Sequence, residues 1–471
     1  MTRNRIGRVA GAALLAAAGL GFGGCRLSHD GGLHSEWTRQ LADWDPHSEP
    51  EATASTEKRD PAAERTGEDQ LAVTGPEDYV RLALERNPGI RAARLRVERL
   101  LEHIPQVSSL DDPTIGIAPI GEMAETAAGQ VSVMTSVSQR LPFPGKLASR
   151  ARVAAQEVAV AAQELEATRL RVKRDTRSAY WSYYYATRAI EVIDADRRLL
   201  AQFREIAAAK YRSGTVSQQD VLRASVELSN LDNELVTLRQ RETTAVALLN
   251  RLLDRSVVAP LPPPAPISLE PTVLELDRLL EEAGARNPAL QAIRERIQGF
   301  RERLELAELQ RRPDFVVGLN YNLVQDEGVA PSANGDDQWW IGLGLNLPIW
   351  TERLDAAERQ ARAGIREGIA QLNDEQNLVA FRLQDGLVRL DTQQRLVELF
   401  RDVIVPQARQ TVEASESSYR AGGLDFLTLV DNWRKLLDFQ LMLHRSLAEF
   451  ERSFADVQEV VGVDLNRGLS E

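Results

Sequence analysis

The 471-residue sequence has very few of the side chains on which most enzyme sites depend. Cys25 is the one cysteine, so no disulfide can form within a chain. The five histidines form neither an i, i+4 pair nor an HExxH motif, and the sequence has no P-loop and no Gly-x-Ser-x-Gly elbow. The net charge of −12 argues against nucleic acid as a partner. We therefore expect a protein that is not an enzyme and has neither a cofactor nor a metal site.

Long hydrophobic runs are also scarce, and no stretch of about 18 apolar residues predicts a transmembrane helix. The apolar run 9–22 follows three arginines, which is the pattern of a secretory signal. It leads into Phe-Gly-Gly-Cys25, which resembles a bacterial lipobox. The resemblance implies a signal peptide at 1–24 and diacylation of Cys25, and Arg26 in place of Asp implies sorting to the outer membrane. Residues 25–72, which are polar and acidic, are then a lipidated, flexible N-terminal segment.

The longest helical pattern runs from residue 146 to 213, where neither Pro nor Gly occurs. A seam of apolar residues recurs every seven positions, which predicts a helix of roughly 100 Å packed lengthwise against other helices. A dimeric coiled coil would also explain the repeat, but the alanines in it favour close packing of many helices in a tube. The seam residues are Val158, Leu165, Val172, Ala179, Ala186, Ile193, Leu200 and Ala207.

Alternation of apolar and polar residues predicts four strands in two pairs, at residues 111–120, 129–140, 315–323 and 339–345. A second long helix is expected at 352–419, with a kink at Pro406. Return helices are expected at 218–254 and 426–461. Each half of the chain thus reads helix, strand, strand, long helix, turn and return helix.

Matching landmarks predict that these halves are a tandem repeat. Asn87-Pro88 recurs 200 residues later as Asn287-Pro288, and the turn ending at Gly214 recurs 208 residues later at Gly422. We expect a first repeat at 73–254, a Pro-rich linker at 255–271 and a second repeat with the C-terminal end at 272–471. Since four strands cannot close a sheet in lipid, we expect the chain to oligomerise.

The repeat, the Asn-Pro helix starts, Leu-Pro-Phe-Pro-Gly-Lys146 and the two Tyr-Arg-x-Gly turns resemble the TolC family of outer-membrane efflux factors. The Lys146 motif is most similar to the heavy-metal efflux branch. The resemblance implies a mainly α fold with a small membrane β part. In a homotrimer, long antiparallel columns would form an α-barrel and four strands per chain would form a 12-stranded β-barrel.

The implied function is passive export of metal ions or small toxic compounds. The duct would lie in the bacterial outer membrane, anchored by lipid and extending into the periplasm, and would receive substrate from an inner-membrane pump through a periplasmic adaptor. The alternative is a lipid-anchored periplasmic coiled-coil adaptor or scaffold. The alternating strands argue against that alternative.

The resemblance also implies three groups of site residues. The turns after the long helices form the tip that meets the adaptor, at Ser213, Gly214, Thr215, Val216, Ala421, Gly422, Gly423 and Leu424. Acidic residues that ring the mouth of the tunnel correspond to Asp220 and Asp431, while Thr428 departs from the pattern and Asp425 is a substitute for it. Aromatic residues of the strands form the membrane girdle, at Phe315, Tyr321, Trp339 and Trp340.

Overall fold

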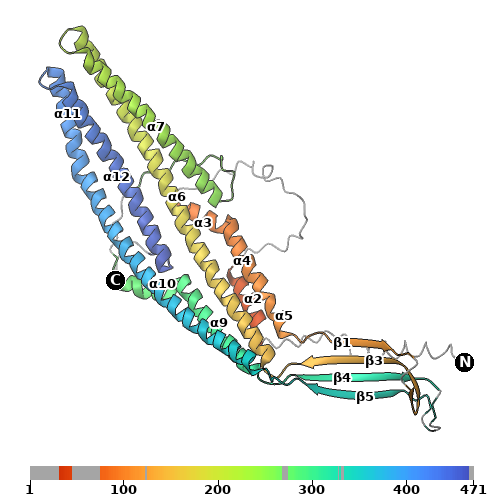
Figure 1. Cartoon of the computed structure of the whole chain (residues 1–471). Coiled ribbons are helices and arrows are strands. Elements are labelled where there is room, and N and C mark those ends of the chain that lie inside the picture. The colour runs from red at the N-terminus through yellow and green to blue at the C-terminus, as the bar shows by residue number, and fades with distance from the viewer. Residues whose placement is uncertain are drawn as a thin grey trace. The chain divides into compact units, whose positions relative to one another are not determined.

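The computed structural model describes residues 31–44, 75–121, 125–267, 274–326, 328–329, 332 and 334–465 (Figure 1). Cys25 and the predicted signal peptide lie outside these residues. In order, the elements before the long turn-forming helices are α2 (Leu33–Trp44), α3 (Pro76–Arg86), α4 (Pro88–Leu101), α5 (His103–Ser108), β1 (Thr114–Pro119), β2 (Glu125–Thr126) and β3 (Gly129–Leu141). They are followed by α6 (Lys146–Arg212), α7 (Gln218–Leu252), α8 (Leu276–Arg286), α9 (Pro288–Leu309), β4 (Phe315–Val324), β5 (Gln338–Leu345), α10 (Thr351–Leu399), η1 (Phe400–Ile404), α11 (Val405–Ala421) and α12 (Phe426–Val461).

The chain divides into two compact units, each built from separate segments of the sequence. Of the described residues, the strand unit takes those within 31–44, 98–158 and 296–367. The helical unit takes those within 75–97, 159–295 and 368–465. Both units therefore draw on both halves of the sequence.

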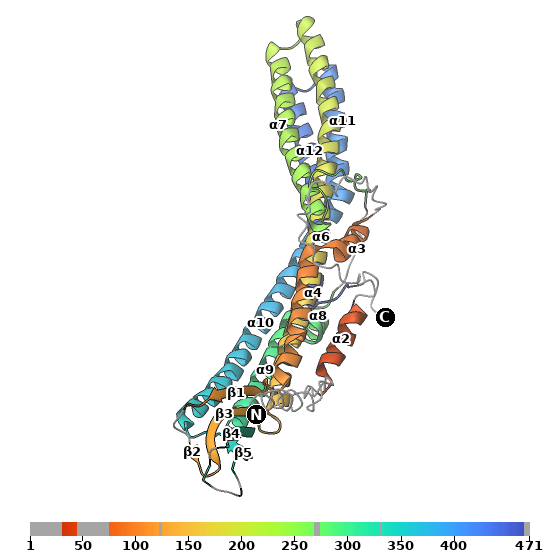
Figure 2. The same ribbon diagram turned by 90° about the vertical axis from the view of Figure 1, so that its right-hand side faces the viewer.

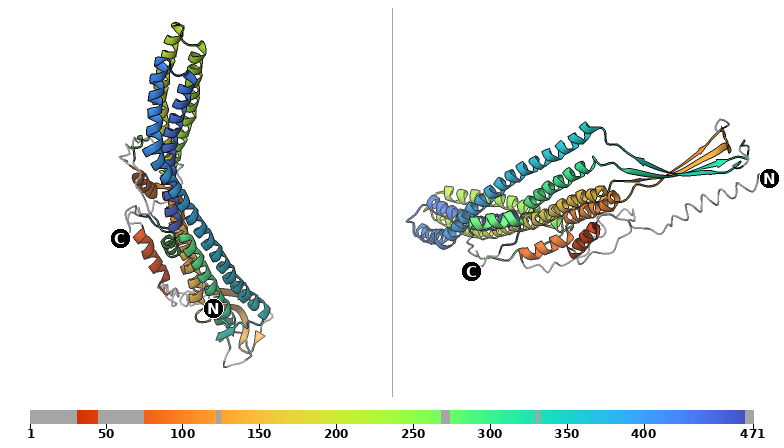
Figure 3. Two further views of the ribbon diagram at one scale, coloured as in Figure 1. Left: turned by 90° about the vertical axis from the view of Figure 1, so that its left-hand side faces the viewer. Right: turned by 90° about the horizontal axis from the view of Figure 1, so that it is seen from below.

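The strand unit holds an antiparallel sheet in the order β1-β3-β4-β5, with the two-residue β2 paired to β3 (Figure 3). Leu141 pairs with Phe315 at one end of the β3–β4 ladder, and Val133 pairs with Leu323 toward the other. The four predicted strands are thus confirmed. Most large apolar side chains of β1, β4 and β5 are exposed in the single chain.

Helix α2 lies within the segment that the sequence analysis expected to be flexible. Leu33, Trp37 and Leu41 recur at i, i+4 and i+8 and form one apolar stripe, and Leu41 is buried. His34 Nε2 lies 3.4 Å from Glu102 Oε1. A short amphipathic helix therefore interrupts this part of the predicted tether.

The helical unit contains most of α6, beside which α7, α11 and α12 run (Figure 2). Helix α6 spans 67 residues, as predicted, and all eight residues of its heptad seam are buried. Two clusters of apolar side chains form the core of this unit, one around Tyr180 and Phe450 and one around Trp433 and Tyr419. The seven-residue repeat therefore identified the face that packs against other helices.

Two Asn-Pro sequences begin helices α4 and α9 in the same way. The Oδ1 of Asn87 accepts from the Gly89 N–H at 2.9 Å, and that of Asn287 accepts from the Ala289 N–H at 2.8 Å. Each amide also donates to the end of a return helix, from Asn87 to the Leu252 carbonyl and from Asn287 to the Val460 carbonyl. The predicted caps are confirmed, and each one also ties its helix to a return helix.

The kink predicted at Pro406 appears as the π-helical turn η1 immediately before α11. The Val405 N–H bonds to the Phe400 carbonyl, five residues back. Proline lacks an N–H and its ring crowds the carbonyl four residues earlier, so a wider turn relieves the clash while the helix continues.

Candidate functional site

The two turns at one end of the helical unit have the same backbone geometry (Figure 1). Gly214 has φ of 75° and Gly422 has φ of 85°, so both adopt the left-handed conformation that other residues rarely take. In each turn the next residue donates its N–H to the carbonyl five positions back, from Thr215 to Lys210 at 3.0 Å and from Gly423 to Ser418 at 2.9 Å. This is the Schellman motif. The two turns predicted at Gly214 and Gly422 are therefore present, and both have the same geometry.

The predicted tip residues lie together in these turns. All are exposed except Val216 and Leu424, which are half-buried. The two turns lie side by side and are exposed. Because they contain glycines, few side chains would block the approach of another protein. The exposed members are Ser213, Gly214, Thr215, Ala421, Gly422 and Gly423.

The helices that leave the turns begin at N-capping residues. Ser217 Oγ accepts from the Gln219 N–H at 3.1 Å. Asp425 Oδ1 accepts from the Thr428 N–H, and Oδ2 accepts from the Thr428 hydroxyl, both at 2.9 Å. These hydrogen bonds lower the pKa of the exposed Asp425 carboxyl. Asp425 is therefore the N-cap of α12. Its position just before an apolar run could have predicted this role from the sequence.

Tyr419 joins the two turns and is almost completely buried. Lys210 Nζ lies 4.7 Å from the centre of its ring and donates to its carbonyl oxygen. The Tyr419 hydroxyl donates to Asp220 Oδ2 at 3.3 Å. Burial, followed by the charge of Asp220, raises the pKa of Tyr419. Asp220, predicted as a mouth residue, therefore holds the turns together in this chain.

Asp431 lies in the second turn of α12 and is exposed. Its carboxylate has no hydrogen-bond partner within the part of the chain that the structure describes. The structure therefore places Asp220, Asp425 and Asp431 near the starts of α7 and α12, but only Asp431 is both exposed and free of an intramolecular role. Arg223 has the equivalent position in α7, 208 residues earlier.

Further from the turns, two polar pairs connect α12 with α6 and α7. Arg434 forms two hydrogen bonds with Glu227, one of them at 3.0 Å. Trp433 Nε1 donates to the buried Asp196 Oδ1 at 2.7 Å. Burial raises the pKa of Asp196 to about 6, against the hydrogen bond from Trp433 and the charge of Arg409.

The predicted girdle residues lie at two ends of the β4–β5 ladder. Phe315 pairs with Leu345 at one end, and Tyr321 pairs with Trp339 toward the other. The four aromatic side chains are exposed, and Trp339 and Trp340 point to opposite faces because they are consecutive in a strand. The structure therefore gathers Tyr321 and the tryptophans at one level of the sheet and separates Phe315 from them.

A polar cluster that sequence reasoning missed lies where the strands meet the long helices of the strand unit. Lys146 Nζ donates to Asp314 Oδ1 and to the Arg312 carbonyl, both at 2.7 Å. Arg140 and the Phe143 N–H also donate to Asp314, at 2.7 and 3.0 Å. Although burial opposes the change, these donors hold the pKa of Asp314 below its usual value. Lys146, the last residue of the Leu-Pro-Phe-Pro-Gly-Lys146 motif, is thus the buried counter-ion of Asp314, which immediately precedes β4.

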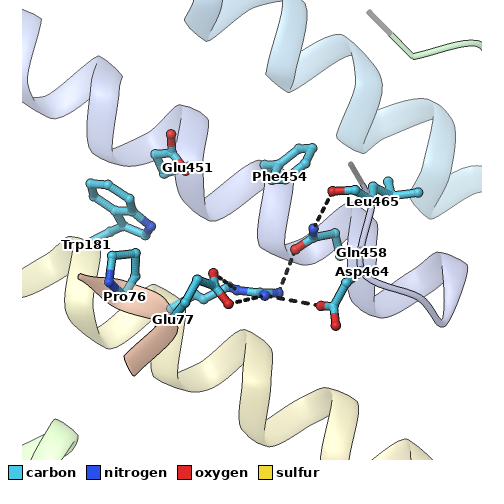
Figure 4. Close-up of a pocket in the computed structure, with 9 residues that line it drawn as sticks. Pro76, Glu77, Trp181, Glu451, Phe454, Gln458, Asp464 and Leu465 are labelled. Atoms are coloured by element: carbon cyan, nitrogen blue, oxygen red, sulfur yellow. Dashed lines mark hydrogen bonds and ion pairs between the residues drawn. The ribbon is translucent and has the colours of Figure 1, made fainter. Parts of the chain in front are cut away.

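A second missed cluster surrounds Arg177 in the helical unit, beside a cavity of about 290 Å³ (Figure 4). The guanidinium bonds both oxygens of Glu77, at 3.0 and 2.9 Å, and also Gln458 and Asp464. Arg177 therefore ties the start of α3 to the segment after α12. We assign this cluster a structural role, because the carboxylates of Glu77 and Asp464 are already paired with Arg177.

The described residues offer no other centre for chemistry. No group of three or more His, Cys, Asp or Glu among them is placed to hold a metal ion. None of the helices in the described ranges is long and apolar enough to cross a membrane. The lipidation site proposed at Cys25 lies outside those ranges.

Comparison with known proteins gives one family and a consistent set of folds. The family model described as outer membrane efflux protein matches residues 79–255 and 279–461. Protein CyaE of Bordetella pertussis is 24% identical over 302 residues, and the match covers 62% of each chain. The chain thus matches less than two thirds of the length of that relative.

Several solved structures share the fold, and three of them are compared below. VceC of Vibrio cholerae has 19% identity and a TM-score of 0.68 over 82% of this chain and 96% of that one. The CmeC outer membrane channel of Campylobacter jejuni has 15% identity and a TM-score of 0.68 over 82% and 85%. CusC has 13% identity and a TM-score of 0.69 over 83% and 92%. These nearly equal scores do not favour one branch of channels over another.

Proposed function

We propose that this chain, which belongs to the outer membrane efflux protein family, forms the exit duct of a tripartite efflux system. Substrate would pass from an inner-membrane pump, through a periplasmic adaptor, into the duct and out of the cell. The observation that carries the proposal is the pair of matching exposed turns around Gly214 and Gly422. Membership of a channel family favours the duct over the alternative of an adaptor or scaffold.

The membrane part is proposed to be a 12-stranded β-barrel shared by a homotrimer. Strands β1 and β5 are the outer strands of the sheet, and each has one paired neighbour in the chain. In lipid the unpaired backbone groups at these edges would each cost several kcal/mol, so pairing β5 of one chain with β1 of the next would stabilise both. Phe315, Val317, Leu319 and Tyr321 share one face with their ladder partners Leu345, Leu343, Ile341 and Trp339, and this apolar face would then contact lipid. Tyr321, Trp339 and Trp340 would lie at the level of one interface, with Trp340 on the opposite face of the sheet.

The two halves of the chain are proposed to be structural repeats. The same family model matches 79–255 and again 279–461. The paired Asn caps and the paired Schellman turns support this division. Three chains with two repeats each would place six similar hairpins around one axis.

The proposed cargo is a metal ion or a small toxic compound. A passive duct contacts its cargo weakly, so we assign the choice of substrate to the pump. Acylation of Cys25 would add a lipid anchor in the outer membrane, since diacylation supplies the two chains that stable anchoring requires.

Native mass measurement of the detergent-extracted protein, followed by conductance in planar bilayers, tests the duct. We expect three copies per particle and discrete channel openings. A stable monomer or dimer, or trimers that never conduct when the tip is opened by added adaptor, would overturn the proposal.

A further inference from the structure

The face of the sheet opposite the apolar one is built from small and polar residues. Residues opposite one another in an antiparallel ladder share a face, so the register assigns each residue of β4 and β5 to one side. This second face contains four ladder pairs: Val316–Gly344, Gly318–Gly342, Asn320–Trp340 and Asn322–Gln338. Glycines and amides therefore make up most of it.

The same composition continues onto the neighbouring strands. Ser136 of β3 pairs with Asn320 on one side and with Gly116 of β1 on the other. A Cβ added at Gly342 would lie 3.6 Å from the Asn320 amide nitrogen, so this amide lies over the glycine. A small, polar face suits the water-filled interior of a membrane barrel, whereas the apolar face suits lipid.

Trp340 is the exception on this second face. Among the described residues of β1, β3, β4 and β5, it is the only aromatic one on that side. It is 45% exposed, and the next residue on its face toward the end of β5 is Gly342, which has no side chain to pack on the ring. Burial therefore does not explain an indole at this position, and contact with a compound in the passage would.

The end of the sheet that carries Trp340 is acidic. Neither 113–139 nor 315–352, which hold the strands and their connecting loops, contains a Lys or Arg. The acidic residues that the structure describes near this end of the strands are Glu125, Asp326, Asp336 and Asp337. Carboxylates around a passage attract cations, and three copies of the chain would multiply the effect.

We propose that Trp340 lines the passage of the duct and that the face of its indole ring binds organic cations on their way out. The inference rests on the proposed trimeric duct and adds the class of cargo that its strand region favours. The face of Trp attracts a cation more strongly than that of Tyr or Phe. A small metal ion that gives up its water reluctantly would gain little from such a contact.

Three such rings would leave the passage open. Twelve strands about 4.8 Å apart and tilted by about 40° enclose a circle about 24 Å across. A ring on the wall of this circle can contact a compound without closing the way. A weak contact suits a duct, because the cargo has to leave as readily as it enters.

A cysteine beside Trp340 tests the assignment of the faces in the full-length protein, reconstituted in lipid vesicles. Gly342→Cys places a thiol two residues along the second face, about 7 Å from Trp340. Ile341→Cys places one on the apolar face. We expect a membrane-impermeant maleimide to label Gly342→Cys and to leave Ile341→Cys unlabelled, and the parent protein controls for reaction at Cys25.

Protection of the Gly342→Cys thiol then measures binding. Methyl viologen, a planar organic dication, should slow the labelling, whereas Mg²⁺ of the same charge should not. Addition of Trp340→Leu should raise the half-protecting concentration of methyl viologen roughly 2- to 30-fold, as expected for loss of a cation–π contact. Trp340→Phe, which keeps a ring, should raise it less, and Trp339→Leu on the apolar face should leave it unchanged.

Each other outcome refutes a defined statement. Labelling of Ile341→Cys without labelling of Gly342→Cys would reverse the faces and overturn the inference. Equal protection by Mg²⁺, no protection by methyl viologen, or a half-protecting concentration that Trp340→Leu does not change would show that the ring binds no organic cation. Each of these results leaves the duct standing if native mass shows trimers, and absence of trimers would overturn the inference together with the proposed function.

Discussion

Replacement of Asp314 by Asn should strongly destabilise the strand unit. The side chains of Lys146 and Asp314 are 1% and 3% exposed, and the closest oxygen and nitrogen are 2.7 Å apart. Asn keeps the shape and one acceptor oxygen but removes the negative charge, so the Lys146 ammonium would be left buried beside two neutral acceptors, the Asn oxygen and the Arg312 carbonyl. Removal of one partner from a buried ion pair costs about 3–5 kcal/mol, and we expect a loss in this range.

Two further variants separate the buried pair from its surroundings. Arg140, the other cation on Asp314, is 50% exposed, so Arg140→Gln should cost at most about 1 kcal/mol. Lys146→Met combined with Asp314→Asn removes the unpaired charge and should be more stable than Asp314→Asn alone.

The measurement is the denaturant midpoint at fixed protein and detergent concentrations, because assembly makes stability depend on concentration. A midpoint for Asp314→Asn equal to that of Arg140→Gln would refute the reasoning. Lys146→Met is also measured alone. A double variant whose loss equals the sum of the losses of Asp314→Asn and Lys146→Met would show that Lys146 and Asp314 are not coupled.

Four other predictions concern the tip, the mouth, the core and the anchor. Gly422→Val should lower efflux while trimers persist, because Val is strained at positive φ. Gly422→Asn should be tolerated, because Asn adopts this conformation. Loss of trimers in the Val variant would leave the turn with only a structural role. Asp431→Asn should weaken the cation preference of the channel in bilayers, and unchanged selectivity and divalent-cation block would make it an ordinary surface carboxylate. Because the pKa of Asp196 is raised to about 6, the folded state holds its proton more tightly than the unfolded state, so stability should fall by about 3 kcal/mol as pH rises from about 4 to 6 and then level off. Asp196→Asn should abolish that fall in a pH series of unfolding curves, and a persistent fall would assign it to another group. Cys25→Ser should abolish incorporation of a fatty-acid analogue, and persistent label would place the lipid on another residue.

The regular parts of this fold could be predicted because each depends on a local period. The heptad seam of α6 marks a buried face, and the alternation in β3 and β4 marks the two faces of a strand. The structure confirms the buried seam and the pairing of the two strands. The family match also confirms the resemblance to TolC-type efflux factors and the expectation of a protein that is not an enzyme. Repeat boundaries, the trimer and the roles of the site residues remain proposals.

The contacts that hold the site together could not be predicted in this way. Lys146 and Asp314 are 168 residues apart, and Tyr419 and Asp220 are 199 apart, so no local pattern connects them. Asp425 shows the opposite case, because its position before an apolar helix would have been sufficient to predict a cap, although the sequence analysis assigned it to the mouth of the tunnel. The proline at 406 predicted a kink, but it did not indicate that the helix would continue through a π turn.

The two hairpins show that a shared backbone does not determine the contacts that the side chains make. Both turns form the same hydrogen bonds. The residues around them differ, because Asp220 and Glu227 of the first hairpin correspond to Thr428 and Lys435 of the second. Asp220 accepts from the Tyr419 hydroxyl and Glu227 accepts from Arg434. A few charged residues of the first hairpin therefore determine how the second hairpin packs against it.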